Sequence, residues 1–180
     1  MRLADEQYEE IKQTVIDTFI TYDVKCIPIN GFELATKMGI TIVPYSSLSK
    51  KKREVAEKFS MDGFSLETSK KWTIYYNDNC RNYGRINQTI MHEIGHYVLG
   101  HTDDGLVEES EAKFFAKYAL APPPLIHTMQ EPITQITISK VFDISLEAAG
   151  YAYTYYNQWL KHSDEYTEYE KMLIRLFAVA

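Results

Sequence analysis

The stretch RINQTIMHEIGHYVLGH, residues 85–101, guides the interpretation of the whole chain. Apolar residues recur in it at steps of three and four, which predicts a core helix over about residues 86–99. Gly100 is a plausible stop for that helix. His92 and His96 are four residues apart, so a helix projects both side chains from one face, one turn apart. Two imidazoles on an otherwise apolar helix are costly to bury unless a partner satisfies them.

The pentapeptide HEIGH, residues 92–96, carries the residue types of a catalytic zinc site. Two neutral imidazoles at this spacing bind one zinc ion tetrahedrally. Glu93 lies one step round the helix, where it reaches a water molecule on the metal instead of the metal itself. Zinc lowers the pKa of that water towards about 7, and a carboxylate then takes its proton. The spacing predicts two ligands, His92 and His96, and a general base, Glu93. The alternative is a partly exposed helix whose histidines find other partners.

A catalytic zinc ion needs a third protein ligand, and three sources compete for the position. His101 follows His96 by five residues, one fewer than in a metzincin-type site, and it fits the end of the helix, where a cation is favoured. Asp103 and Asp104 lie in a loop too close to the helix to turn back easily. The third source is the glutamates of the next helix: Glu108, Glu109 and Glu111.

Among these candidates, the sequence favours Glu111. Its helix face also carries Phe114, Phe115 and Tyr118, the side expected to pack inward. Glu108 lies one turn earlier and is the second choice. Two histidines and one glutamate form the ligand set of the gluzincin type, so Zn²⁺ is the predicted cofactor.

Two segments together resemble the ImmA/IrrE family of metallo-endopeptidases. That family reads as arginine, three residues and TxxHExGH, followed downstream by EAxxFAxxLLxP. Arg85 and residues 89–96 match the first pattern, and EAKFFAKYALAP, residues 111–122, matches the second. Alanine replaces one family leucine at Ala119. The match is specific only in these two segments.

The resemblance implies a zinc-dependent endopeptidase in which Glu93 is the general base. It also implies that His92, His96 and Glu111 hold the metal. Family members cut a helix-turn-helix repressor, often one encoded beside them on a phage or integrative element, so the expected partner is a protein substrate of that kind. The competing hypothesis is a non-catalytic regulatory module of a mobile element that binds zinc or a protein.

Composition limits the possible functions further. The 180 residues are 45% hydrophobic and 13% aromatic, as expected for a globular protein. The formal net charge of −6 argues against general nucleic-acid binding. Cys26 and Cys80 stand in no metal-binding spacing and indicate a reducing compartment. The sequence contains no signal peptide and no run of about 20 apolar residues, so we expect a cytoplasmic protein that makes no membrane contact.

The remaining patterns predict an α+β fold that is zincin-like and of the gluzincin type. A small β-sheet would lie beside the active-site helix, and a helical segment would follow. Residues 47–59 would form a polar turn leading into a basic segment. The other expected elements are helices at 5–22, 31–38, 107–121 and 164–178, two or three short helices within 133–160 with Ser145 as an N-cap, a strand at 40–45, and a hairpin with arms at 61–68 and 71–78.

The proline run at residues 122–124 marks the candidate domain boundary. Residues 1–125 would form the metallopeptidase domain, and residues 126–180 a helical segment packed on it. The latter has a weak helix-turn-helix rhythm. Its second helix offers tyrosines but no Lys or Arg over residues 146–160, so DNA binding is not expected.

An extended substrate is expected to add to an edge strand beside the metal. The predicted edge strand is Trp72–Asn77, in which Trp72, Ile74 and Tyr76 would contact the substrate. The oxyanion of the reaction needs a hydrogen-bond donor. Three residues are candidates for it, and the sequence does not choose among them: Tyr83, Tyr97 and His127.

Overall fold

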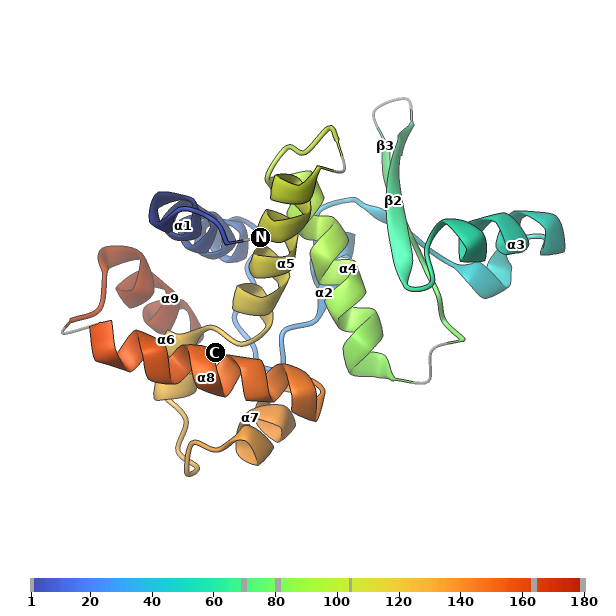
Figure 1. Ribbon diagram of the computed structural model, residues 1–180. Helices are drawn as coiled ribbons and strands as arrows, with labels where there is room; N and C mark the ends of the chain where they lie inside the picture. Colours follow the sequence, from blue (N-terminus) through green and yellow to red (C-terminus); the bar gives the residue numbers. More distant parts are fainter. Residues whose placement is uncertain (1, 69–70, 80–81, 104, 163–164, 179–180) are drawn as a thin grey trace.

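The fold is α+β, mostly helical with one small sheet, which confirms the predicted fold class. The structure, a computed structural model, describes residues 2–68, 71–79, 82–103, 105–162 and 165–178. Cys80 and Asp104 lie outside these ranges. Figure 1 shows α4 (Tyr83–Val98) between the sheet and a body of helices.

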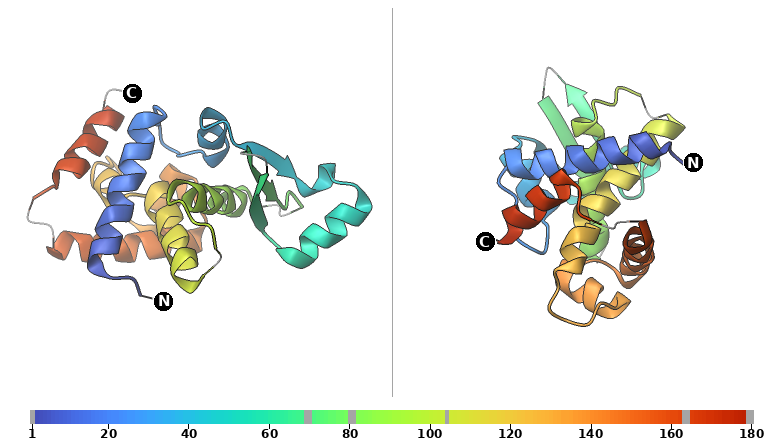
Figure 2. Two further views of the ribbon diagram at one scale, coloured as in Figure 1. Left: turned by 90° about the horizontal axis from the view of Figure 1, so that it is seen from above. Right: turned by 90° about the vertical axis from the view of Figure 1, so that its left-hand side faces the viewer.

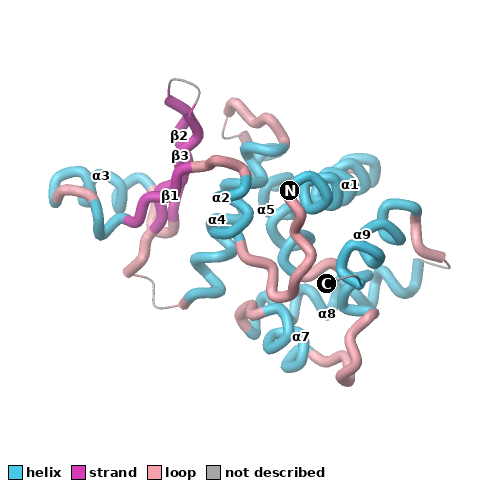
Figure 3. Tube along the Cα trace, turned by 180° about the vertical axis from the view of Figure 1, so that it is seen from behind, coloured by secondary structure: helices cyan, strands magenta, loops and turns pink. Residues whose placement is uncertain are grey.

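The sheet has three strands in the order β1-β3-β2. Strand β1 (Thr41–Pro44) pairs parallel to β3 (Lys71–Tyr76), and β2 (Gly63–Thr68) pairs antiparallel to it. The predicted hairpin and the preceding strand are thus confirmed. The parallel pairing was not foreseen, and it makes β3 the central strand. Figure 3, seen from behind, shows the strands gathered at one end of the molecule with α3 beyond them.

A turn at residues 47–49 precedes α3 (Lys50–Phe59), as predicted, but the basic segment that follows is a helix, which was not expected. The sequence KKKREVAEKF consists mainly of strong helix formers, which explains the helix. Only Val55, Ala56 and Phe59 are apolar among its ten residues, and only Ala56 is buried, so its apolar face is narrow. The helix was therefore missed because propensity, not burial, determines its structure.

The helices around α4 follow the prediction closely. They are α1 (Asp5–Thr21), α2 (Gly31–Lys37) and α5 (Leu106–Leu120). Helix α4 itself begins earlier than expected, because the side chain of Asn82 caps it by accepting a hydrogen bond from the amide of Arg85 at 3.2 Å.

The C-terminal part is helical, as predicted. It consists of α6 (Pro123–His127), α7 (Gln135–Phe142), α8 (Leu146–His162) and α9 (Glu168–Ala178). The Ser145 hydroxyl accepts a hydrogen bond from the amide of Ala148 at 3.1 Å, which confirms the predicted N-cap. Helix α8 is long where short helices were expected. Figure 2 shows α9 lying beside α1, where the rings of Phe19 and Phe177 are 6.1 Å apart.

The buried core continues across the proline run. Phe19, Ile90 and Phe115 belong to the same apolar cluster as Phe142 and Leu173. The division of the chain at residue 125 stays a prediction. Among the described residues, no helix is both long and apolar enough to cross a membrane.

Candidate active site

Helix α4 presents the HEIGH residues because its opposite side is anchored in the core. Ile90, Met91 and Ile94 are fully buried there. Gly95 lies against α5, and a Cβ added to it would be 3.3 Å from the Cα of Ala112. The missing side chain therefore lets α5 approach α4 closely. This approach brings the first turn of α5 beside the two histidines.

Three side chains from α4 and α5 form a group that could hold a metal ion: His92, His96 and Glu109. The Nε2 atoms of His92 and His96 are 3.1 Å apart. Glu109 Oε1 lies 3.6 Å from Nε2 of His92 and 3.4 Å from Nε2 of His96. Ligands bound at about 2.0–2.1 Å to a tetrahedral zinc ion lie roughly 3.3 Å from one another. The three donor atoms therefore have the separation that a tetrahedral ion requires.

The electrostatics of the group favour metal-binding protonation states. Burial, and next the charge interaction with the neighbouring His96, lower the pKa of His92 to about 4. Burial raises the pKa of the Glu109 carboxyl, but the hydrogen bond from Lys113 and the nearby imidazoles outweigh it, and the pKa ends below its ordinary value. Lys113 contacts Oε2 at 2.8 Å, whereas Oε1 faces the imidazoles. Near neutral pH the site thus offers a neutral His92 and an ionised Glu109.

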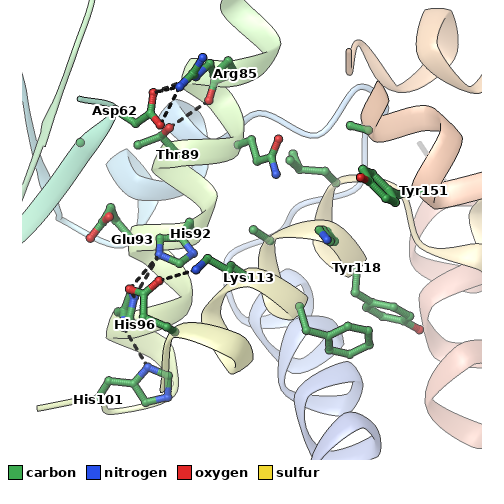
Figure 4. A pocket seen from close by; sticks show the side chains of 18 of the residues that line it. Asp62, Arg85, Thr89, His92, Glu93, His96, His101, Lys113, Tyr118 and Tyr151 are labelled. Atoms are coloured by element: carbon green, nitrogen blue, oxygen red, sulfur yellow. Dashed lines mark hydrogen bonds and ion pairs between the residues drawn. The ribbon is translucent and has the colours of Figure 1, made fainter. Parts of the chain in front are cut away.

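Glu93 is buried next to this group but is not one of its three members. Its Oε2 accepts a hydrogen bond of 2.7 Å from the hydroxyl of Ser65, on β2. Figure 4 shows Glu93 beside His92, on the side of α4 that faces the sheet. Helix α4 therefore supplies the two imidazoles, and the sheet holds the neighbouring carboxylate in place.

Glu111, the expected third ligand, does not join His92 and His96. Its Oε1 accepts a hydrogen bond from Gln7 Nε2 at 2.9 Å, and its Oε2 lies 3.0 Å from Nε2 of His101. Residues two positions apart in an α-helix are separated by roughly 200° around its axis, so Glu109 and Glu111 cannot face the same neighbour.

The inward face of α5 exists as predicted, but the part of it that carries Glu111 and Phe114 packs toward α1 and does not point at the histidines. The rings of Phe114 and Tyr8, on α1, are 4.6 Å apart. Phe115, also on the predicted face, lies against Gly95 of α4 together with Ala112. Glu109 lies one turn before Ala112 on that face, which explains why it reaches the histidines. The sequence had offered Glu109 as a candidate, but which face of α5 lies against α4 is decided by the tertiary contact of Ala112 with Gly95.

The other candidate ligands also lie elsewhere. The Glu108 carboxylate lies over Gly105, at the start of α5. Asp103 is exposed. The Nδ1 atom of His101 lies 3.0 Å from Nδ1 of His96, on the opposite edge of the His96 ring from the metal-binding group.

The predicted substrate strand is not an edge. Strand β3 is paired with β1 through Thr73–Tyr76 and with β2 along its length, so the prediction that a peptide adds to Trp72–Asn77 was wrong. Ile74 is fully buried, and the ring of Tyr76 packs on Phe32 at 5.3 Å. Trp72 does line the cleft that contains the histidines.

Strand β2 is the edge strand beside the site. Gly63 and Ser65 line the cleft together with His92 and Glu93. A Cβ on Gly63 would be 2.7 Å from Cγ2 of Thr89, so glycine allows this strand to lie against α4. One turn before Thr89, Arg85 donates two hydrogen bonds, of 2.8 and 2.9 Å, to the Asp62 carboxylate (Figure 4).

The three candidate oxyanion donors are not among the described residues that line the cleft. Tyr83 stacks on Phe32, and Tyr97 packs on Trp72. His127 Nδ1 lies 2.8 Å from the hydroxyl of Tyr156, in an aromatic cluster between α6 and α8. No candidate for this role is supported.

Two histidines and a glutamate on adjacent helices, next to a carboxylate held by an edge strand, define a metallopeptidase-like α+β protein. The sequence model of a peptidase family, M78, described as the IrrE N-terminal-like domain, matches residues 35–154. The chain therefore belongs to this family, which confirms the resemblance. Membership supports a metallopeptidase activity, and with it a protein substrate and a metal. No curated protein matches the chain.

Proposed function

We propose that this protein is a zinc-dependent endopeptidase that cuts one peptide bond in a helix-turn-helix transcriptional repressor in the cytoplasm. The observation that carries the proposal is the separation of 3.1–3.6 Å among the Nε2 atoms of His92 and His96 and Oε1 of Glu109. The choice of a repressor, and of a phage or integrative element as its source, rests on the family resemblance alone.

The proposed ligands are His92, His96 and Glu109, with Glu109 in the position first expected for Glu111. Neutral imidazoles and one ionised carboxylate are the donor set of a gluzincin-type zinc site, which leaves a coordination position open. Zinc supplies Lewis-acid polarisation of a carbonyl group and makes a water molecule more acidic.

Glu93 is the proposed general base. Its burial and the hydrogen bond from Ser65 hold the carboxylate next to the ligands without making it one of them. It would accept a proton from the attacking water and pass that proton to the leaving amine. Because Ser65 belongs to β2, the strand that holds the base is also the strand proposed to bind the substrate.

A substrate peptide would extend the sheet at β2. Main-chain hydrogen bonds to an edge strand fix an extended peptide without reading its sequence, and side-chain contacts then give specificity. Leu66 is 45% exposed and, like Trp72, lines the cleft. These two residues are the proposed apolar contacts of the substrate, in place of Ile74 and Tyr76.

The test compares metal content and cleavage in four proteins: the wild type, Glu93→Gln, Glu109→Gln and Glu111→Gln. We expect one zinc ion per chain in the wild type and in Glu93→Gln, and a strong loss of zinc in Glu109→Gln. Cleavage of the repressor encoded next to this protein should be lost in Glu93→Gln and in Glu109→Gln.

Two results would contradict the proposal. Zinc retained in full by Glu109→Gln but lost from Glu111→Gln would return the ligand role to Glu111. A wild-type protein that binds zinc but cleaves neither the repressor encoded next to it nor unfolded polypeptides would support a non-catalytic module.

A further inference from the structure

A chain of polar side chains extends from His96 away from the metal-binding group. His96 Nδ1 lies 3.0 Å from Nδ1 of His101, and His101 Nε2 lies 3.0 Å from Oε2 of Glu111. The other oxygen of Glu111 accepts a hydrogen bond from Gln7, on α1. The His101 side chain is only 7% exposed, so this histidine is held by protein groups and not by solvent.

The end of α4 determines where His101 lies. Gly100 has φ +69°, in the left-handed region that favours glycine. The amide of His101 donates to the carbonyl of His96 at 3.0 Å, and that of Gly100 donates to the carbonyl of Tyr97 at 3.3 Å. These two bonds form a Schellman motif. The motif folds the chain back, so that the ring of His101 contacts the ring of His96 (Figure 4).

The hydrogen bonds along this chain permit one arrangement of protons when a metal is bound. If Nε2 of His96 donates its lone pair to a metal, its Nδ1 carries the hydrogen and donates it to Nδ1 of His101. His101 then accepts at Nδ1, so its own hydrogen is on Nε2 and is donated to Glu111. The carboxylate of Glu111 accepts from both His101 and Gln7. Each hydrogen-bonding atom in this series of side chains therefore has a single role, as donor or as acceptor.

We propose that His101 and Glu111 are positioning residues of the metal centre, which fix the tautomer and orientation of His96. The proposal rests on the proposed metal site. Hydrogen bonds from a ligand imidazole to an outer acceptor orient the ring and strengthen it as a ligand. In most such sites a carboxylate or carbonyl contacts the ligand directly, whereas here a second imidazole lies between the ligand and the carboxylate.

This assignment also explains why two of the sequence candidates for the third ligand are not ligands. His101 approaches the Nδ1 edge of the His96 ring, and the metal-binding group lies at the Nε2 edge. Glu111 is bound to His101 and Gln7. Both residues therefore act on the metal only through His96.

The first test measures zinc affinity by competition with a chromophoric chelator. His101→Phe removes the acceptor, and zinc affinity should fall roughly 10- to 100-fold. His101→Asn places an amide oxygen near the position of Nδ1 and should restore most of the affinity. The matched control is His162→Phe, on the exposed end of α8, which should bind zinc like the wild type. Circular dichroism of the metal-free proteins checks that each variant folds.

The second test needs no variant. Long-range proton–nitrogen NMR correlations of the zinc-loaded wild type should show His101 with its hydrogen on Nε2 and His96 with its hydrogen on Nδ1. A hydrogen on Nδ1 of His101 would overturn the proposal. So would equal zinc affinities of the wild type and His101→Phe. A wild-type protein that binds no zinc would instead refute the proposed function, so the two failures are distinguishable.

Discussion

Ser65 and Glu93 are joined by a hydrogen bond of 2.7 Å that links the sheet to the active-site helix. Ser65→Ala should therefore lower kcat for cleavage of the proposed repressor substrate roughly tenfold, because a carboxylate without this donor is less well placed. Zinc content and KM should change little. Steady-state kinetics on the purified repressor measure both constants. Ser65→Thr, which keeps a hydroxyl, serves as the control, and an unchanged kcat in Ser65→Ala would show that the base is positioned by other contacts.

Gly95 is the second residue whose replacement should be informative. A Cβ there would lie 3.1 Å from Cδ1 of Phe115 and 3.3 Å from the Cα of Ala112. Gly95→Val should therefore destabilise the metal-free protein by about 1–3 kcal/mol through overpacking, although valine has the higher helix propensity. Denaturant unfolding measures this change. The variant should also bind zinc more weakly, because α5 carries Glu109; a variant as stable as the wild type would contradict the close packing of α4 on α5.

The stability of the metal-free protein should depend on pH through His92. Its pKa is about 4 in the folded chain, below the ordinary value of 6.5. The unfolded chain therefore binds the proton first as the pH falls, and stability decreases between about pH 6.5 and pH 4 and then levels off. The full effect would be about 3 kcal/mol.

Urea unfolding with a chelator at several pH values tests this prediction. The comparison protein is His92→Gln, in which the contribution of His92 is absent while other groups still titrate. The unfolding free energy of the wild type minus that of His92→Gln should decrease as the pH is lowered from 6.5 to 4. A difference that stays constant across this range would show that His92 does not titrate as described.

The ion pair between Arg85 and Asp62 should contribute little to stability despite its two short hydrogen bonds. Their side chains are 58% and 45% exposed, and exposed pairs contribute less than about 1 kcal/mol. A double-mutant cycle with Arg85→Ala and Asp62→Ala, read by thermal unfolding, gives the coupling. Either substitution should instead raise KM, because the ion pair orients the start of β2, the proposed substrate-binding strand, against α4. A coupling of several kcal/mol would mean that the pair is a main determinant of the fold.

The part of the site within one helix could be predicted from the sequence. Helical periodicity alone places His92 and His96 on one face with Glu93 beside them. The third ligand was a different problem, because the choice between Glu109 and Glu111 depends on how α5 is rotated against α4. That rotation is set by the contact of Gly95 with Ala112, a tertiary contact that no local pattern reports.

The strands show the same limit. Composition predicted the hairpin arms, since β2 and β3 are adjacent in the chain and pair with each other. Strand β1 joins β3 from a distant segment, in parallel, and this pairing changes β3 from an edge strand into the central one. Helix α3 was missed for another reason, because its sequence is mostly charged and only Ala56 among its ten residues is buried.

The division of labour between the sheet and the helices has a consequence for local unfolding. The proposed metal ligands all lie on α4 and α5, whereas Glu93 is held by Ser65 on an edge strand. Opening of the β2–β3 hairpin would release the base from its anchor and leave the ligand group intact. The protein could thus rest in a metal-loaded but inactive state, and a substrate strand that pairs with β2 would stabilise the closed, active one. Amide hydrogen exchange should then be faster in the hairpin than in α4, and it should slow when an inactive substrate peptide binds; equal protection in both segments would argue against such a resting state.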